Sequence, residues 1–195
     1  MLSHRFGPGP YYIEFEVSIE GKTNFFTLKT APIDLMPHSI YVFMDMVHRK
    51  VWNNTVIIHM WNHIVQAAPI TPEGENRRTA INGELMFPEH SDFFNHEEYT
   101  VGFSGRPGGP EFYINLLNNA SSHGPGRQDH SKVLNDADPC FAKVIDGHHT
   151  VDLLRALSVR MIKDKKENGG QGFAFSSIEE ARIIIPQTSL AGEID

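Results

Sequence analysis

The alternation of apolar and polar residues near the N-terminus is the feature that most constrains the fold. Residues 13–20 read Ile-Glu-Phe-Glu-Val-Ser-Ile-Glu. A period of two is that of a β-strand with one buried face and one solvated face. A turn at Glu20-Gly21-Lys22 and a second strand-like run at 24–30 predict a hairpin. The ordered part of the chain is therefore expected to begin as antiparallel sheet.

Two helices are predicted further along. The segment 38–49 carries apolar residues at i, i+3, i+4 and i+7, which form one face of an amphipathic helix. These residues are Ile40, Phe43, Met44 and Val47. A shorter helix is expected at 150–157, with Val151 and Leu154 facing inward.

More strands lie between and after these helices. They are expected at 56–68 (two short strands broken near 61–63), 99–104, 112–117, 140–144 and 181–185. Long loops are expected at 69–96, 118–139 and 163–172. About eight strands with one helix near each end favour a mainly β fold, a barrel capped by two helices. A two-layer α+β sheet is the alternative.

Composition excludes several classes of protein. The 195 residues are 40% hydrophobic and 21% charged, which suits one globular domain and argues against disorder. A net charge of -7 argues against nucleic acid as a partner, because phosphate contacts need a basic face. No apolar run approaches the ~18 residues of a membrane span. Cys140, the single cysteine, excludes an internal disulfide or a multi-thiolate metal site and is expected to be buried and inert.

The expected organisation is an irregular lead-in at 1–10, a domain at 11–186 and a tail at 187–195. The N-terminal sequence is compatible with a piece cut from a longer protein or a larger assembly. Glycosylation sequons begin at Asn53 and Asn119, but about one would arise by chance, so they do not establish secretion. The compartment stays open between the cytoplasm and the lumen of the secretory pathway.

An ordered set of short motifs resembles the cyclophilins, a family of peptidyl-prolyl isomerases. Ile58-His59 and then Val65-Gln66-Ala67-Ala68 match the family's Phe-His-Arg and Phe-Met-x-Gln-Gly-Gly segments. Residues 109–114, Gly-Pro-Glu-Phe-Tyr-Ile, match Gly-Ser-Gln-Phe-Phe-Ile. Phe-Ala-Lys-Val at 141–144 is followed by Gly147 and by Thr-Val-Asp at 150–152, in the family's order. The resemblance implies an eight-stranded antiparallel barrel, a helix over each end, and a substrate groove on the outer wall.

The chemistry implied by the resemblance is rotation about an X-Pro amide, whose barrier is ~18–20 kcal/mol. No bond is made or broken, so neither a cofactor nor a metal is expected. Family members stabilise the twisted amide with an arginine that directly follows the histidine of Phe-His-Arg. Here that position is Met60, and a thioether donates no hydrogen bond.

The other groove positions of the family carry over with mixed results. Gln66 and Leu134 are retained, Tyr113 replaces a phenylalanine, and Glu111 replaces a glutamine. The residues expected at the groove are His59, His63, Ile64, Gln66, Phe103, Glu111, Tyr113, Leu134 and Asp138. His59 is expected to be a buried, hydrogen-bonded histidine, as is its family counterpart.

We therefore expect an isomerase-like domain whose activity is weak or lost. Arg106, in the 105–110 loop, is the one candidate for replacing the missing arginine, although a solvated turn residue is the preferred interpretation. A non-catalytic module that binds a Pro-containing or other extended peptide is the alternative, and Glu111 and Asp138 would favour basic partners. A scaffold domain that uses the loops at 69–96 and 118–139 is a third.

Eleven histidines are many for this length and raise the question of a metal site. His59 and His63 are four residues apart, but the local pattern is strand and turn, and no accompanying Glu motif is present. His148 and His149 are adjacent. Core or incidental histidines are the preferred interpretation, and no metal site is predicted.

Overall fold

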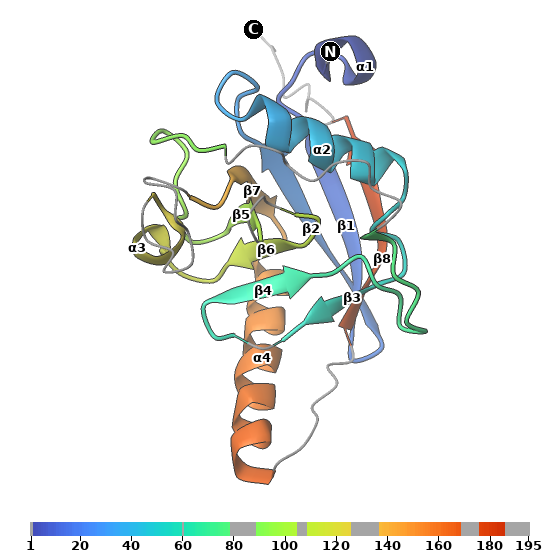
Figure 1. Cartoon of the computed structure of the whole chain (residues 1–195). Coiled ribbons are helices and arrows are strands. Elements are labelled where there is room, and N and C mark those ends of the chain that lie inside the picture. Colours follow the sequence, from blue (N-terminus) through green and yellow to red (C-terminus); the bar gives the residue numbers. More distant parts are fainter. Residues whose placement is uncertain are drawn as a thin grey trace, which may run out of the picture.

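The computed structural model of the chain describes residues 2–59, 61–78, 89–104, 109–125, 137–168 and 176–185. Within them, eight antiparallel strands close into a barrel in the order β1-β2-β7-β5-β6-β4-β3-β8 (Figure 1). The strands are β1 (Tyr12–Ile19), β2 (Lys22–Thr30), β3 (Thr55–Ile58), β4 (Ile64–Ala67), β5 (Thr100–Phe103), β6 (Phe112–Asn115), β7 (Cys140–Asp146) and β8 (Ser176–Ile184). The predicted mainly β barrel is confirmed, and the two-layer sheet is wrong.

The N-terminal hairpin forms as predicted. β1 pairs with β2 from Tyr12↔Lys29 to Ile19↔Lys22. The two turn residues, Glu20 and Gly21, both have positive φ, at 50° and 77°, as in the tight turn that suits twisted hairpins. The apolar positions of the alternation point into the barrel, so the period of two separates core from solvent.

Helix α2 (Pro37–His48) lies over one end of the barrel (Figure 1). Its apolar stripe is buried as predicted, with Ile40, Phe43 and Met44 at 0% exposure. The first turn is capped from a distant segment, because the Glu89 carboxylate accepts hydrogen bonds from the backbone N–H groups of His38 (3.0 Å) and Ser39 (2.7 Å). A carboxylate at a helix N-terminus also complements the helix dipole.

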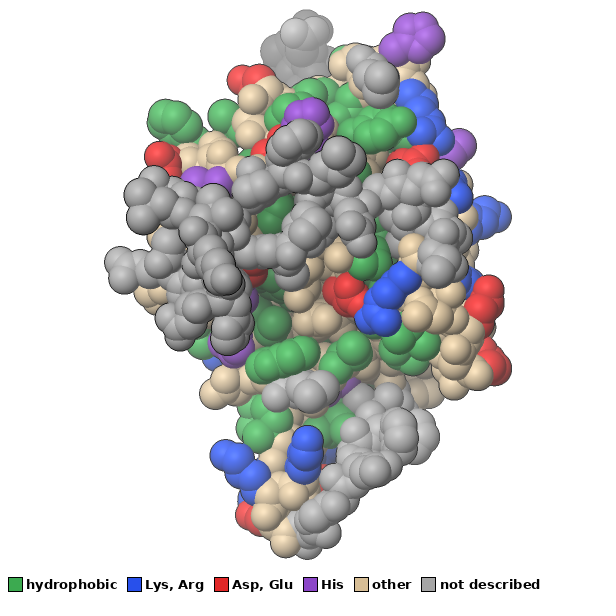
Figure 2. All heavy atoms as spheres, in the orientation of Figure 1, with side chains coloured by type: hydrophobic (Ala, Val, Ile, Leu, Met, Phe, Trp, Pro, Cys, Tyr) green, Lys and Arg blue, Asp and Glu red, His purple; other side chains and the backbone are tan. Residues whose placement is uncertain are grey.

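Helix α4 (His148–Asn168) starts at the opposite end of the barrel and is much longer than predicted (Figure 1). The expected helix at 150–157 is confirmed but too short, and the expected loop is wrong over 163–168, because the helix is 21 residues long in all. Ser158 and Met161 extend the buried stripe beyond Leu154. The last turns project past the barrel and carry mixed basic and acidic side chains (Figure 2), which favour a helix without needing a core.

Two short helices lie in segments that were predicted to be irregular. α1 (Leu2–Phe6) forms within the lead-in, where Leu2 is 6% exposed. α3 (Ala120–His123) forms within the loop at 118–139. Each is a single turn or little more, too short to have an apolar period that sequence reasoning can detect.

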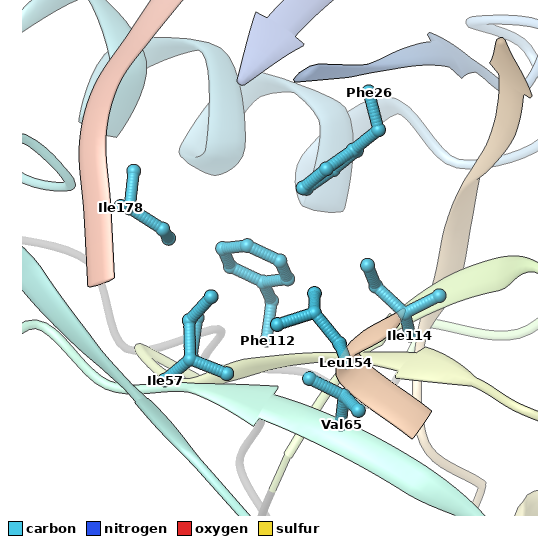
Figure 3. A pocket seen from close by; sticks show the side chains of 8 residues that line it. Phe26, Ile57, Val65, Phe112, Ile114, Leu154 and Ile178 are labelled. Atoms are coloured by element: carbon cyan, nitrogen blue, oxygen red, sulfur yellow. The ribbon is translucent and has the colours of Figure 1, made fainter. Parts of the chain in front are cut away.

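The interior of the barrel is filled by apolar side chains. The open space left between Phe26, Phe112 and Leu154 is only about 10 Å³ (Figure 3). Leu154 reaches this space from α4, and Phe112 reaches it from β6. An apolar space of this size holds at most one water and no ligand. Any binding site of the barrel must therefore be on its outside.

Cys140 is buried, and burial raises the pKa of its thiol to about 12. The described residues contain no group of three or more His, Cys, Asp and Glu side chains arranged to hold a metal ion. Among the described helices, none is both long enough and apolar enough to span a membrane.

Candidate functional site

The outer wall of β5, β6 and β4 carries most of the predicted groove residues. On β4, Val65 and Ala67 line the interior, so Ile64 and Gln66 face outward. On β6 the same alternation turns Tyr113 outward. The register places Gln66 opposite Tyr113, so the strand pairing brings these two predicted site residues together.

Gly102 on β5 makes room for the Tyr113 hydroxyl. These two residues are partners in the β5–β6 register. A Cβ atom at position 102 would lie 2.8 Å from Tyr113 Oη, closer than real contacts allow, and 3.0 Å from the Pro139 carbonyl oxygen, which is tighter than most real contacts. The absence of a side chain at this position leaves room for the hydroxyl where it meets Asp138.

The Tyr113 hydroxyl enters a buried polar group that we call the outer-wall cluster. Its members are Tyr113, His96, Asn115, Asn119, His123 and Asp138. Tyr113 Oη donates to Asp138 Oδ2 at 3.0 Å, and His123 Nδ1 lies 2.7 Å from the same oxygen. Asp138 is 3% exposed, and Tyr113 is 1% exposed. Both donors therefore compensate a carboxylate that has been removed from water.

A second layer of hydrogen bonds holds the cluster in place. His96 Nε2 donates to the Asp138 carbonyl oxygen at 3.0 Å. The Asn119 amide nitrogen donates to Asn115 Oδ1 at 2.7 Å and to the His63 carbonyl oxygen at 3.0 Å. These bonds tie the loop before β5, the end of β6, α3 and the segment before β7 to one another.

Burial lowers the pKa of His96 in the cluster and of the neighbouring His63. The pKa of His96 falls to about 4, and the lowering at His63 includes a smaller contribution from the nearby His123. His123 Nδ1 lies against Asp138, and the other ring nitrogen, Nε2, is buried and has no hydrogen-bond partner among the described residues.

Glu111 is engaged by an arginine that sequence reasoning did not select. Arg78 donates to Glu111 Oε1 through Nε at 2.5 Å and also through a terminal guanidinium nitrogen. The Glu111 side chain is 13% exposed and that of Arg78 is 41% exposed. Since Asp138 is also paired internally, both groove carboxylates already have cationic or hydrogen-bonding partners within the chain.

His59 lies away from the outer wall, as a buried, hydrogen-bonded histidine. Its Nδ1 lies 2.6 Å from Ser158 Oγ on α4, and its Nε2 lies 2.5 Å from Ser176 Oγ on β8. Ser158 donates its own proton to the Leu154 carbonyl oxygen, so it accepts from His59 Nδ1–H. Burial lowers the pKa of His59 to about 4. Both ring nitrogens are therefore occupied, and a part in substrate binding stays a prediction.

The remaining predicted residues lie in different places. Phe103 is 0% exposed, because the alternation along β5 turns its side chain into the barrel. There its ring stacks on that of Phe141, with the two ring centroids 4.5 Å apart. This position differs from the predicted one at the groove. Met60, Arg106 and Leu134 lie outside the described residues.

The two sequons are placed differently. Asn119 is 2% exposed and its amide nitrogen is fully used within the outer-wall cluster. The folded domain therefore does not present Asn119 for glycosylation. Asn53 is half-buried, and its Oδ1 accepts a hydrogen bond from the backbone N–H of Ala181 at 3.2 Å.

Sequence reasoning missed His96, Asn115, Asn119, His123 and Arg78. The only available signal was the excess of histidine and the spacing of Asn115 and Asn119 by four residues. Neither signal identifies a partner, because the cluster is assembled from segments that are far apart in the chain.

The sequence and the fold match known proteins. Residues 24–169 match the family model described as cyclophilin type peptidyl-prolyl cis-trans isomerase/CLD. The structure is similar to that of a cyclophilin type peptidyl-prolyl cis-trans isomerase from Cryptosporidium parvum, with a TM-score of 0.57 and 14% identity over 90% of this chain and 98% of that one. The same protein in the presence of the dipeptide Ala-Pro gives a TM-score of 0.56 at 14% identity, over 90% and 99%. No curated protein sequence matches the chain.

Proposed function

The chain belongs to the cyclophilin type peptidyl-prolyl cis-trans isomerase family, and we propose that its outer wall binds an extended, Pro-containing peptide segment with weak or no isomerase activity. The observation that carries the expected loss of isomerase activity is the state of Tyr113, whereas peptide binding is proposed from family membership. The Tyr113 ring is 1% exposed, and its hydroxyl donates to Asp138 in a polar cluster. A proline ring needs an open apolar wall, and a ring held this way offers little of one.

The sequence supports the same conclusion. Met60 stands where the resemblance implies the catalytic arginine, so the donor that stabilises the twisted amide is missing from its usual position. Removing one such donor from an enzyme typically lowers the rate by ~10²–10³. Arg78 brings a guanidinium to the wall, but it is already engaged with Glu111.

A protease-coupled assay of a Pro-containing tetrapeptide tests the proposal. With the purified chain, we expect the isomerisation rate to be close to the uncatalysed rate. Met60→Arg should raise this rate, and Met60→Leu is the matched control. Full family-like turnover by the unmodified chain would overturn the proposal. If Arg106→Ala or Arg78→Ala then abolished that turnover, the variant would identify which arginine acts.

A second candidate is a non-catalytic module that works through its loops rather than through the wall. The observation that favours it is Phe93, in the segment predicted as a long loop, which is 88% exposed. Titration of the tetrapeptide separates the two candidates. Saturable binding that Gln66→Ala weakens supports the wall, whereas no binding, together with a partner interaction lost in Phe93→Ser, supports the loops.

A further inference from the structure

A second concave surface lies on the β2–β7 side of the barrel. It is formed on β2 and β7, which are not strands of the outer wall, although β7 pairs with β5 at the edge of that wall. The groove has a volume of about 520 Å³. It is lined by Gly9, Pro10, Lys29, Thr30, Pro32, Ile33, Asp34, Phe94, Lys143 and Ile145. A volume of this size lies within the usual range of ligand-binding pockets, ~300–1,000 Å³.

Two lysines face each other across the floor of this groove. Lys29 on β2 and Lys143 on β7 are direct partners in the antiparallel register. Like charges directly opposite one another on a sheet are destabilising, so this pair is unfavourable unless an anion lies between them.

The chain supplies few anions to the lysine pair. Lys143 Nζ lies 3.6 Å from Glu97 Oε2, with both side chains largely exposed, and such pairs are weak. No carboxylate of the described residues pairs with Lys29, whose ammonium lies 5.8 Å from the centre of the Tyr12 ring. Asp34 lines the groove but forms no ion pair with either lysine. Lys29 therefore has no ion pair among the described residues, and Lys143 has only one exposed and weak partner, in a chain that is acidic overall.

Apolar side chains flank the charged floor. Ile145 is 44% exposed and sits where the β2–β7 register shifts, because Leu28 pairs with Val144 and Thr27 pairs with Asp146. Such an extra residue is a β-bulge, which turns its side chain out of the regular pleat. Ile33 and Phe94 form the facing walls.

We propose that this groove is a docking site for an extended, acidic segment of a partner protein in which carboxylates alternate with apolar side chains. A carboxylate binds between Lys29 and Lys143, and the apolar side chains pack against Ile33, Ile145 and Phe94. Phe93, next in the chain to the lining residue Phe94, is strongly exposed and so is available to a protein segment that continues past the groove. This site is distinct from the outer wall, where we propose that the Pro-containing peptide binds.

The test is a fluorescence titration with an octapeptide that alternates aspartate and leucine and is blocked at both ends. A peptide that alternates lysine and leucine is the control ligand. We expect saturable binding of the acidic peptide only, weakened about tenfold in Lys29→Glu and in Lys143→Glu, and weaker at high salt. Lys22→Glu, an exposed change on the same strand, is the matched control and should bind normally.

The thermal midpoint of each variant shows that a loss of binding does not reflect unfolding. Lys29→Glu places a negative charge opposite Lys143, so its midpoint should be equal to or above that of the unmodified chain. Unchanged binding in both lysine variants would overturn the proposal, and so would equal binding of the lysine–leucine peptide. Dimerisation of the unmodified chain that Lys29→Glu abolishes would also overturn it, since the occupant would then be a second copy.

Discussion

His59 and His96 are both buried, and both have a low pKa of about 4. Their hydrogen-bonding surroundings nevertheless differ. His59 is held by two serine hydroxyls, one on α4 and one on β8, which leave no ring nitrogen free. His96 belongs to the outer-wall cluster, where the bonds continue through a tyrosine, two asparagines, an aspartate and His123.

The difference lies in what each region leaves unsatisfied. The His59 region is complete, because both ring nitrogens have a serine hydroxyl as partner and together join α4 and β8. The outer-wall cluster ends at His123 Nε2, which is buried without a partner among the described residues. A buried polar atom without a partner is costly, so it marks a place where folding alone does not explain the residues. A low pKa therefore does not separate a structural histidine from a candidate functional one, whereas the partners do.

Acidification should have the largest effect, and it should affect both regions alike. Each histidine has a folded pKa near 4 and an unfolded pKa near 6.5, so the unfolded chain binds more protons in between. Stability is full above pH 6.5 and falls as the pH drops towards 4, by about 3 kcal/mol for each histidine. Urea denaturation between pH 8 and pH 4 measures this loss.

Substitution of either histidine should remove its share of the acid sensitivity. His59→Asn and His96→Asn are each expected to reduce the slope between pH 6.5 and 4.5, a window that lies above most carboxylate pKa values, and His63, whose pKa is also lowered, accounts for part of the remainder. A slope that neither variant changes would show that other groups control the acid response.

His59→Ala should cost about 3 kcal/mol at pH 7.5, because it opens a cavity and leaves two serine hydroxyls without their partner. His149→Ala is the control on α4, the helix that His59 contacts; its side chain is exposed, and the substitution should change the free energy of unfolding by less than about 0.5 kcal/mol. Equal effects of the two substitutions, measured by urea denaturation, would mean that His59 does not join α4 to the barrel.

The sequence predicts the regions of this molecule unequally. The β1–β2 hairpin and α2 follow from local periods of two and of 3.6 residues, because each buries one face. The length of α4 was missed, since its last turns project from the barrel and carry no apolar stripe. Lys163 and Glu167, an i,i+4 pair at 3.9 Å, belong to a helix, although the same residues suggest a charged loop.

The outer-wall cluster was only partly predictable. Tyr113 and Asp138 were found because their positions match family motifs. His96 and His123 come from a loop and from a one-turn helix, where no period and no motif selects them. Arg78 meets Glu111 across 33 residues of sequence, a pairing that only the folded barrel creates. Local patterns therefore determine the strands, whereas the site depends on long-range contacts.

Asp138→Asn tests whether the outer-wall cluster depends on its charge. The carboxylate accepts hydrogen bonds from both Tyr113 and His123, and an amide retains only part of this capacity. We therefore expect the free energy of unfolding to fall by about 2 kcal/mol. Asp164→Asn, an exposed change on α4, is the control and should have no measurable effect. A loss below about 0.5 kcal/mol for Asp138→Asn would show that the cluster tolerates a neutral centre.

Tyr113→Phe should have the smallest effect and should distinguish stability from binding. It removes one hydrogen bond to Asp138 and keeps the ring, so we expect a loss of about 1 kcal/mol in the free energy of unfolding. Because the hydroxyl points into the cluster, the affinity for a Pro-containing tetrapeptide should change less than about threefold, a free-energy difference below ~0.7 kcal/mol. Tyr12→Phe on β1 is the matched control. A tenfold change in affinity with unaltered stability would place the Tyr113 hydroxyl in contact with the peptide. It would contradict the assignment of this hydroxyl to the outer-wall cluster.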